Sequence, residues 1–131
     1  MSQVLVVDAS VVVDLIGRFR PQPIEALLWA EDSVLAAPEL LDVEVLQALR
    51  RLDRDGAVPP SRADVVELLR ALRIRRFRHD GLRDAIWSLR KKLTAYDAAY
   101  VALANLLDAT LVTRDAKLAR APGLDVQVVV P

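Results

Sequence analysis

The chain has 131 residues, of which 53% are hydrophobic, a length and composition that favour one compact domain over residues 1–131 with a substantial core. It contains no Cys, which excludes disulfides, thiol nucleophiles and cysteine-rich zinc sites and is compatible with a reducing, cytoplasmic location. Lys plus Arg and Asp plus Glu balance at 18 each, so any nucleic-acid binding has to come from local basic clusters.

The N-terminal segment predicts a buried strand followed by a helix. Residues 4–7, VLVV, form a continuous apolar run, which is typical of a strand covered on both faces of a parallel sheet. The run ends at Asp8, and we expect Ser10 to cap a helix that ends near Gly17. Asp8 and Asp14 interrupt the apolar stretch and no basic segment precedes it, so the sequence predicts neither a signal peptide nor a membrane span.

The next part of the chain predicts a helix, a strand and a long helix. A short helix over residues 24–31 is followed by a strand over 33–38. Residues 39–55 predict a long helix that Gly56 closes. The apolar stripe of this helix consists of Leu41, Val45, Leu49 and Leu52.

The C-terminal half repeats the alternation of helices and strands. We expect Ser61 to cap the first of its helices. The predicted helices cover 62–73, 81–92, 94–107 and a short turn at 115–119, and the predicted strands cover 74–78, 109–113 and 126–130. Strands that alternate with helices predict an α/β sandwich around a mainly parallel central sheet of four to five strands.

Four acids lie where they would converge at one edge of such a sheet. Ligands bind outside the carboxyl ends of parallel strands, and Asp8 and Asp115 each follow a predicted strand. Glu44 lies beside the apolar stripe of its helix, and Asp97 shares a helix face with Val101, so both are expected to point inward.

Converging carboxylates repel one another and acquire raised pKa values unless a cation joins them. Oxygen ligands, in a chain with no Cys and one His, suit Mg²⁺ or Mn²⁺ rather than zinc. Such an ion activates water and stabilises charge on a phosphodiester, which is the chemistry of a metal-dependent nuclease.

Four stretches together resemble a PIN domain, specifically the toxin of a VapBC-type toxin–antitoxin pair. They are VVDAS at 6–10, PELLDVEVLQAL at 38–49, LTAYDAAYVALA at 93–104 and LVTRDAKLA at 111–119, and the match spans nearly the whole chain. The resemblance implies a PIN-like three-layer α/β/α sandwich and an endoribonuclease that uses Mg²⁺ or Mn²⁺ to cleave RNA. It also implies a small antitoxin protein whose tail occupies the site, and a homodimer.

The resemblance also implies roles for individual positions. Asp8, Glu44 and Asp97 match the family's metal-binding acids, and Asp115 matches the fourth acid of the site. Thr113 matches a hydroxyl residue that helps to order the site, and Ser10 is expected to act in the same way.

Each acid also has a purely structural interpretation. Thr94 and Asp97 fit a capping box, and Asp8 and Asp115 fit caps of the helices that follow them. Glu44 is a good helix former on any solvated face.

Other polar residues are interpreted more simply. Asp14 and Asp42 are expected to be solvated or supporting, and His79, the single His, is expected to be a surface residue. The basic clusters at 50–54 and 73–78 are compatible with contact to RNA phosphates, but structural roles at a helix end and a sheet edge are favoured.

Three functions are compared. The favoured one is a metal-dependent endoribonuclease toxin, and the alternative is a catalytically inactive PIN-like protein that serves as a binding or assembly module. Metal-dependent RNA cleavage by pure protein separates these two. A phosphoacceptor signalling domain is disfavoured, because the strand at 33–38 ends without an Asp and LVTRD offers Arg and Asp where a Lys is needed.

Overall fold

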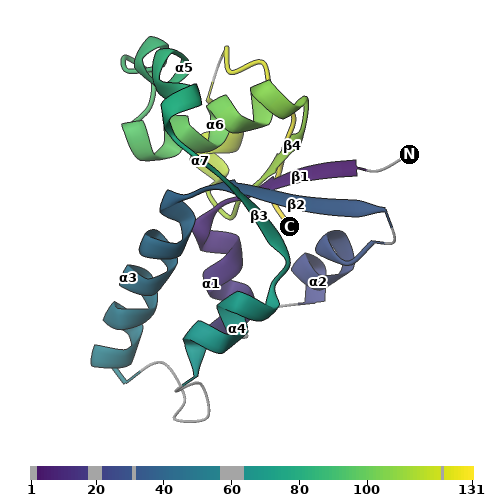
Figure 1. Cartoon of the computed structure of the whole chain (residues 1–131), viewed down its shortest axis with the longest axis vertical. Coiled ribbons are helices and arrows are strands. Elements are labelled where there is room, and N and C mark those ends of the chain that lie inside the picture. Colours follow the sequence, from purple (N-terminus) through teal and green to yellow (C-terminus); the bar gives the residue numbers. More distant parts are fainter. Residues whose placement is uncertain (1–2, 18–21, 31, 57–63, 122) are drawn as a thin grey trace.

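The computed structural model describes residues 3–17, 22–30, 32–56, 64–121 and 123–131. A five-stranded sheet in the order β3-β2-β1-β4-β5 lies at the centre of the molecule, as Figure 1 shows. The strands are β1 (Gln3–Val7), β2 (Ser33–Pro38), β3 (Ile74–Phe77), β4 (Thr110–Val112) and β5 (Val128–Val129). All four pairings are parallel, which confirms the predicted sheet.

Helices cover both faces of the sheet. In Figure 1, α1 to α4 lie below the strands, while α5 and α6 lie above them, so the predicted three-layer sandwich is confirmed. The α-helices are α1 (Ala9–Gly17), α2 (Gln22–Leu28), α3 (Leu40–Arg54), α4 (Val65–Ala71), α5 (Arg83–Ser88), α6 (Ala95–Leu107) and α7 (Ala116–Arg120). Within the described ranges, no helix combines the length and apolar character needed to cross a membrane.

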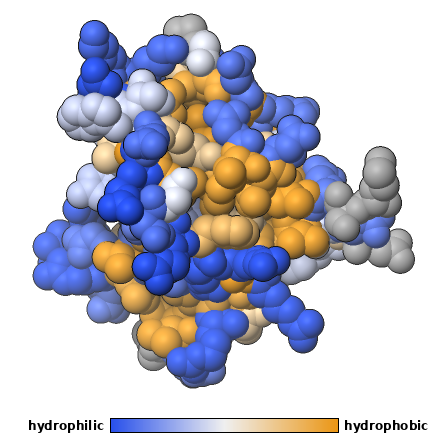
Figure 2. Space-filling model, turned by 45° about the horizontal axis from the view of Figure 1, so that its top comes forward, coloured by the Kyte–Doolittle hydropathy of each residue, from blue (hydrophilic) through white to orange (hydrophobic). Residues whose placement is uncertain are grey.

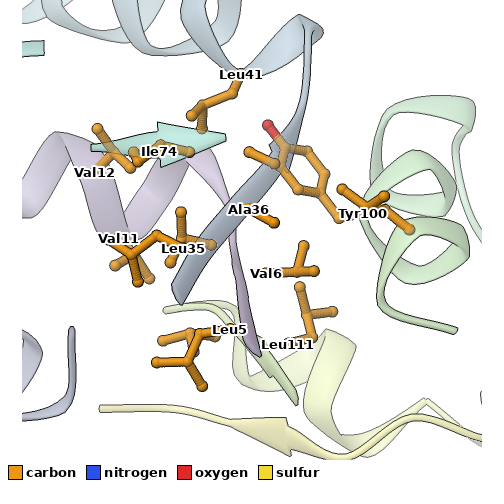
Figure 3. Close-up of a cluster of buried hydrophobic side chains, with 14 of the residues drawn as sticks. Leu5, Val6, Val11, Val12, Leu35, Ala36, Leu41, Ile74, Tyr100 and Leu111 are labelled. Carbon is orange, nitrogen blue, oxygen red and sulfur yellow. The ribbon is translucent and has the colours of Figure 1, made fainter. Parts of the chain in front are cut away.

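The central strand β1 explains why the sheet forms where the apolar runs predict it. Leu5, Val6 and Val7 have no exposed surface, because helices cover both faces of the strand. Figure 3 shows Leu5 and Val6 among buried side chains of the neighbouring strands and helices. From α3, the predicted stripe contributes Leu41, Val45 and Leu49 as buried residues, and Leu52 is partly buried.

The register of the sheet brings two distant polar residues together. Val7 of β1 pairs with Val112 of β4, so Asp8 and Thr113 follow at the same edge. The Asp8 N–H donates to the Val112 carbonyl oxygen at 3.1 Å, which continues the ladder by one step. The carboxyl end of the central pair of strands therefore has two polar side chains next to each other.

The observed N-terminal caps of α1 and α4 differ from the predicted ones. Ser10 does not cap α1: the helix begins at Ala9, and Asp8 is the cap, because its Oδ1 accepts from the Val11 N–H at 3.3 Å. Ser10 is the second residue of α1, so it lies inside the helix, and its hydroxyl donates to Asp8 Oδ1. The predicted cap Ser61 lies outside the described residues, and α4 is capped by Asp64, which accepts from the Glu67 N–H.

Two predicted helices differ in extent. The helix predicted over 24–31 covers Gln22–Leu28, since Pro23 is tolerated in a first turn, and the predicted end at Glu31 lies outside the described residues. The helix predicted over 81–92 is divided into a 3₁₀ turn at Asp80–Leu82, α5, and tight turns up to Leu93. Ser88 contributes to this break, because its hydroxyl donates to the Ala85 carbonyl oxygen at 2.7 Å and competes with the helical pattern.

Candidate active site

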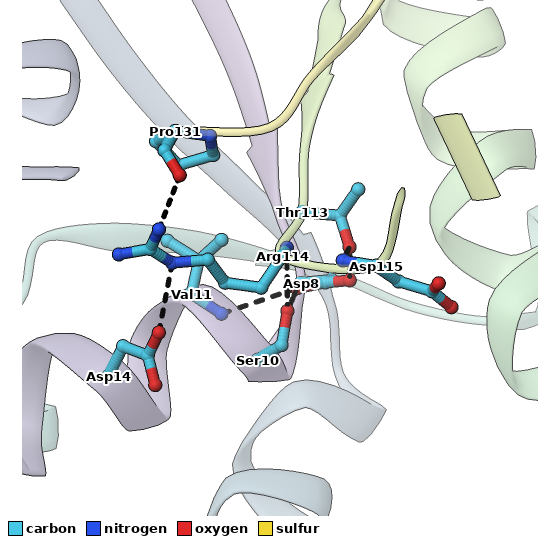
Figure 4. A network of polar contacts seen from close by, with 8 residues as sticks. All are labelled: Asp8, Ser10, Val11, Asp14, Thr113, Arg114, Asp115 and Pro131. Carbon is cyan, nitrogen blue, oxygen red and sulfur yellow. Dashed lines mark hydrogen bonds and ion pairs between the residues drawn. The ribbon is translucent and has the colours of Figure 1, made fainter. Parts of the chain in front are cut away.

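Asp8 lies at the buried end of β1, where hydrogen bonds hold both carboxylate oxygens. Oδ1 accepts from the Ser10 hydroxyl at 2.5 Å and from the Val11 N–H, and Oδ2 accepts from the Thr113 hydroxyl (Figure 4). Asp8 is only 8% exposed. Burial raises the pKa of Asp8, and the hydrogen bonds from Ser10 and Thr113 oppose that rise.

Thr113 connects Asp8 to the loop that carries Asp115. Its hydroxyl oxygen accepts from the Asp115 N–H at 3.0 Å while its hydroxyl hydrogen goes to Asp8. The Asp115 side chain is exposed, and its Oδ1 accepts from the Lys117 N–H at 2.9 Å, so Asp115 caps α7 as one interpretation predicted. Thr113 thus fixes the relative position of two of the four acids.

Arg114 fastens the same loop to α1. Its Nε lies 2.9 Å from Asp14 Oδ2, and its main-chain N–H donates to the Ser10 hydroxyl oxygen at 3.0 Å. Its Nη1 donates to the main-chain oxygen of Pro131, as Figure 4 shows. Asp14 is therefore not merely solvated, because it forms a mostly buried ion pair with Arg114. This ion pair holds the loop that carries Asp115 beside Asp8. We call the region around Asp8, Glu44, Asp97 and Asp115 the acid site.

Glu44 is held by a residue from the opposite side of the sheet. It is half-buried on α3, and its Oε1 accepts from the Tyr100 hydroxyl of α6 at 2.6 Å. Burial raises the pKa of Glu44, the Tyr100 hydrogen bond opposes this, and the negative charges of Asp8 and Asp97 raise the pKa further. Glu44 therefore lies within electrostatic reach of two other acids.

Asp97 lies in the first turn of α6 and is half-buried. Its N–H donates to the Thr94 hydroxyl oxygen at 3.2 Å, which confirms Thr94 as the helix cap. Burial raises the pKa of the Asp97 carboxyl, the charge of Asp115 raises it further, and a hydrogen bond with Thr94 opposes the rise. The cap uses the main-chain N–H, so capping and ligand roles are compatible at this position.

The four acids come from four separate segments, and the charge of each acts on at least one of the others. Glu44 interacts with Asp8 and with Asp97, and Asp97 interacts with Asp115. Nevertheless, in the part of the chain that the structure describes, no three Asp, Glu or His side chains are grouped closely enough to hold one ion as they stand. The donor chemistry itself fits a hard divalent cation, because these groups offer only carboxylate oxygens and a cation would remove their mutual repulsion.

His79 is not a plain surface residue, which corrects the expectation from the sequence. It is half-buried, and its Nε2 accepts from the Leu40 N–H at 3.0 Å. Leu40 is the first residue of α3, and Glu39, which precedes it, makes no side-chain cap. His79 therefore provides the hydrogen-bond acceptor for the first N–H of the helix that carries Glu44. Because the two residues are 39 positions apart, no local sequence pattern indicates this contact.

Two other contacts were missed from the sequence. Arg76 forms a two-pronged ion pair with Asp42, with Nη2 at 2.7 Å from Oδ1 and Nε at 3.1 Å from Oδ2, so neither side chain is simply solvated. Arg76, a member of the 73–78 cluster, is therefore used in an ion pair within the protein, whereas Arg73 and Arg75 are exposed to solvent. Tyr100 could have been noticed, because a Tyr on a helix of otherwise small apolar residues needs a partner for its hydroxyl.

Comparison with known proteins identifies the family. Residues 5–124 match the family model described as the PIN domain. The chain belongs to the PIN-domain family. This PIN domain is 39% identical over 125 residues to Ribonuclease VapC1 of Mycobacterium tuberculosis, covering 94% of each chain. It is 41% identical over 117 residues to VapC ribonuclease Mb0985 of Mycobacterium bovis, covering 87% of each chain.

A solved structure supports the same assignment of the fold. The PIN domain is similar to the crystal structure of VapBC2 from Rickettsia felis bound to a DNA fragment from their promoter, with a TM-score of 0.67 and 16% identity. The match covers 97% of this chain and 98% of that chain. The family model and the 39% and 41% identities to VapC ribonucleases confirm the resemblance to VapC-type PIN domains that the sequence motifs carry.

Proposed function

We propose that this PIN domain is a metal-dependent endoribonuclease that acts as the toxin of a type II toxin–antitoxin pair. The observation that carries the proposal is the series of interacting carboxylates at one sheet edge, with Asp8 buried and Glu44, Asp97 and Asp115 accessible. Relatives that are 39% and 41% identical are named ribonucleases, which supports RNA as the substrate.

Asp8, Glu44, Asp97 and Asp115 would hold Mg²⁺ or Mn²⁺. When bound, the ion supplies an activated water and stabilises negative charge on the phosphodiester. The chain's own residues prepare the site: Thr113 and Ser10 orient Asp8 through hydrogen bonds to its two oxygens. The ion pair of Arg114 with Asp14 keeps the loop of Asp115 in place.

The partners follow from the same assignment. We propose that this PIN domain, a candidate toxin similar to the VapC relatives, pairs with a small antitoxin protein that blocks the acid site. We further propose that the chain forms a homodimer. RNA cleavage of this kind would take place in the cytoplasm, in line with the absence of Cys.

The alternative is a catalytically inactive PIN-like module that binds or assembles without cutting. All four acids are present, and burial raises the pKa of three of them, Asp8, Glu44 and Asp97, a perturbation that is common among carboxyls at functional sites. A module that had lost catalysis would not need to retain this arrangement. The acids therefore favour the enzyme.

The test is RNA cleavage by the purified protein with Mg²⁺ or Mn²⁺ and with a chelator. Asp8→Asn and Asp97→Asn should abolish cleavage, because an amide cannot supply the charge that holds the cation. Asp84→Asn is the matched control, since Asp84 is an exposed residue of α5 outside the acid site, and it should cleave like wild type. Cleavage by wild type in chelator, or undiminished cleavage by both site variants, would remove the metal-site hypothesis.

A further inference from the structure

The hydrogen bond between Tyr100 and Glu44 joins two helices that lie on opposite faces of the sheet. α3 packs on α1 and β2, whereas α6 packs on β1, β2 and β4. Figure 3 shows the Tyr100 ring reaching from α6 across the buried cluster, with its hydroxyl at the end far from its own helix. The hydroxyl meets Glu44 Oε1 at 2.6 Å, although the two residues are 56 positions apart.

Glu44 needs such a contact to stay near the other acids. It is half-buried, and the charges of Asp8 and Asp97 act against its ionised form. A Glu side chain on a helix has several rotatable bonds, and turning toward water would relieve both burial and repulsion. A donor aimed at Oε1 opposes that rotation.

Tyr100 is suited to this task because it remains a hydrogen-bond donor. A phenol hydroxyl is protonated at neutral pH, and the hydroxyl donates to Glu44 Oε1 at 2.6 Å. Tyr100 is 3% exposed and packs in the core, so its hydroxyl has a defined position. Among the described residues, none donates to Glu44 Oε2, which leaves that oxygen for a ligand.

We propose that Tyr100 is a positioning residue of the acid site: its hydroxyl holds the Glu44 carboxylate toward Asp8 and Asp97, so that Glu44 contributes to cation binding. This inference rests on the proposed metal-dependent function. It assigns to Tyr100 a role through Glu44 and no contact with RNA or with the reacting atoms.

The experiment compares Mn²⁺ binding to wild type, Tyr100→Phe and Tyr96→Phe by titration calorimetry without RNA. Tyr100→Phe keeps the buried ring and removes only the hydroxyl, and we expect Mn²⁺ affinity to fall roughly 10-fold or more, as for other residues that orient metal ligands. Tyr96 lies on the same helix and is 65% exposed, so Tyr96→Phe should bind Mn²⁺ like wild type. Circular dichroism of each metal-free protein checks that it is folded.

A double-mutant cycle separates positioning from a general effect on the fold. In a Glu44→Ala background, Tyr100→Phe should cause no further loss of Mn²⁺ affinity, because the group that Tyr100 orients is absent. An equal further loss in that background, or equal affinities of wild type and Tyr100→Phe, would overturn the positioning role alone. Failure of wild type to bind Mn²⁺ would overturn the proposed function and, with it, this inference.

Discussion

The Thr113 hydroxyl donates a hydrogen bond to Asp8 Oδ2 across a separation of 105 positions in the chain. The same hydroxyl oxygen accepts from the Asp115 N–H, so one side chain joins the ends of β1 and β4 at the acid site. The bond to Asp8 depends on the register that places Val7 beside Val112, whereas the bond from the Asp115 N–H is local to the loop after β4.

Thr113→Val should therefore lower the free energy of unfolding. The substitution keeps the size of the side chain but leaves Asp8 Oδ2 without its donor, at a cost of about 1–3 kcal/mol. Urea unfolding of the metal-free protein measures this. Thr110→Val on the same strand is the control, because no hydrogen bond of the Thr110 hydroxyl is found among the described residues, and equal effects of both variants would contradict the role of Thr113.

Thr94→Ala and Asp97→Asn should separate the stabilising effect of the α6 cap from the effect of metal binding at the acid site. Thr94→Ala removes the acceptor for the Asp97 N–H and should cost about 0.5–2 kcal/mol with or without metal. Asp97→Asn keeps that N–H, so metal-free stability should be unchanged or higher, while the rise in melting temperature on adding Mn²⁺ should shrink or vanish. Thermal melts in chelator and in Mn²⁺ decide the matter, and an equal Mn²⁺-induced shift in wild type and Asp97→Asn would refute the ligand role.

The metal-free stability difference between Asp97→Asn and wild type should depend on pH. The folded-state pKa of Asp97 lies above its ordinary value of 3.8, so the folded protein binds this proton more tightly than the unfolded chain does. The resulting stabilisation is fully present below that ordinary value and is lost as pH rises through the folded-state pKa. The stability of Asp97→Asn, measured as melting temperature in chelator, should thus rise relative to wild type as the pH increases from about 4 through the folded-state pKa of Asp97. A difference that is constant over this range would contradict the raised pKa.

His79→Ala should destabilise α3 at its first residue. The Leu40 N–H would lose its acceptor, which should lower the free energy of unfolding by about 1 kcal/mol. His79→Gln retains an acceptor on a flexible side chain and should recover part of the loss. Denaturant unfolding compares the three proteins, and identical midpoints would show that the His79 contact does not stabilise the helix.

The proposed homodimer should be visible as twice the monomer mass in light scattering at micromolar concentration. The sequence predicts that the short helix does not bury all of Leu27, Leu28 and Trp29, and the structure agrees: Leu28 is buried, Leu27 is partly buried and Trp29 is 57% exposed. Figure 2 shows an area of apolar side chains on one face, surrounded by hydrophilic residues, which is typical of a contact surface. Other large exposed apolar side chains are Val34, Val43, Leu46, Val66, Trp87, Tyr96, Leu106 and Val130. A monomeric mass would refute the dimer.

The sequence by itself determined the parallel sheet, because residues 4–7 form a continuous apolar run that is typical of a strand buried on both faces and because strands alternate with helices along the chain. It also predicted which acids follow strands, since the carboxyl ends of parallel strands share an edge. Each acid lies within a short characteristic stretch, so the resemblance to PIN domains is apparent from the sequence alone. The division of the helix predicted over 81–92 was missed, because the apolar pattern signals neither the 3₁₀ turn at Asp80–Leu82 nor the Ser88 hydrogen bond at the end of α5.

Only the tertiary structure decided what supports the acids. Thr113 reaches Asp8, Tyr100 reaches Glu44, and His79 reaches the first turn of α3 across long stretches of chain. Hydrogen bonds require the two atoms to come within about 3 Å in a suitable orientation, and sheet register and helix packing, rather than local spacing, set that geometry. The same holds for Asp14, whose pairing with Arg114 follows from α1 and the end of β4 lying side by side.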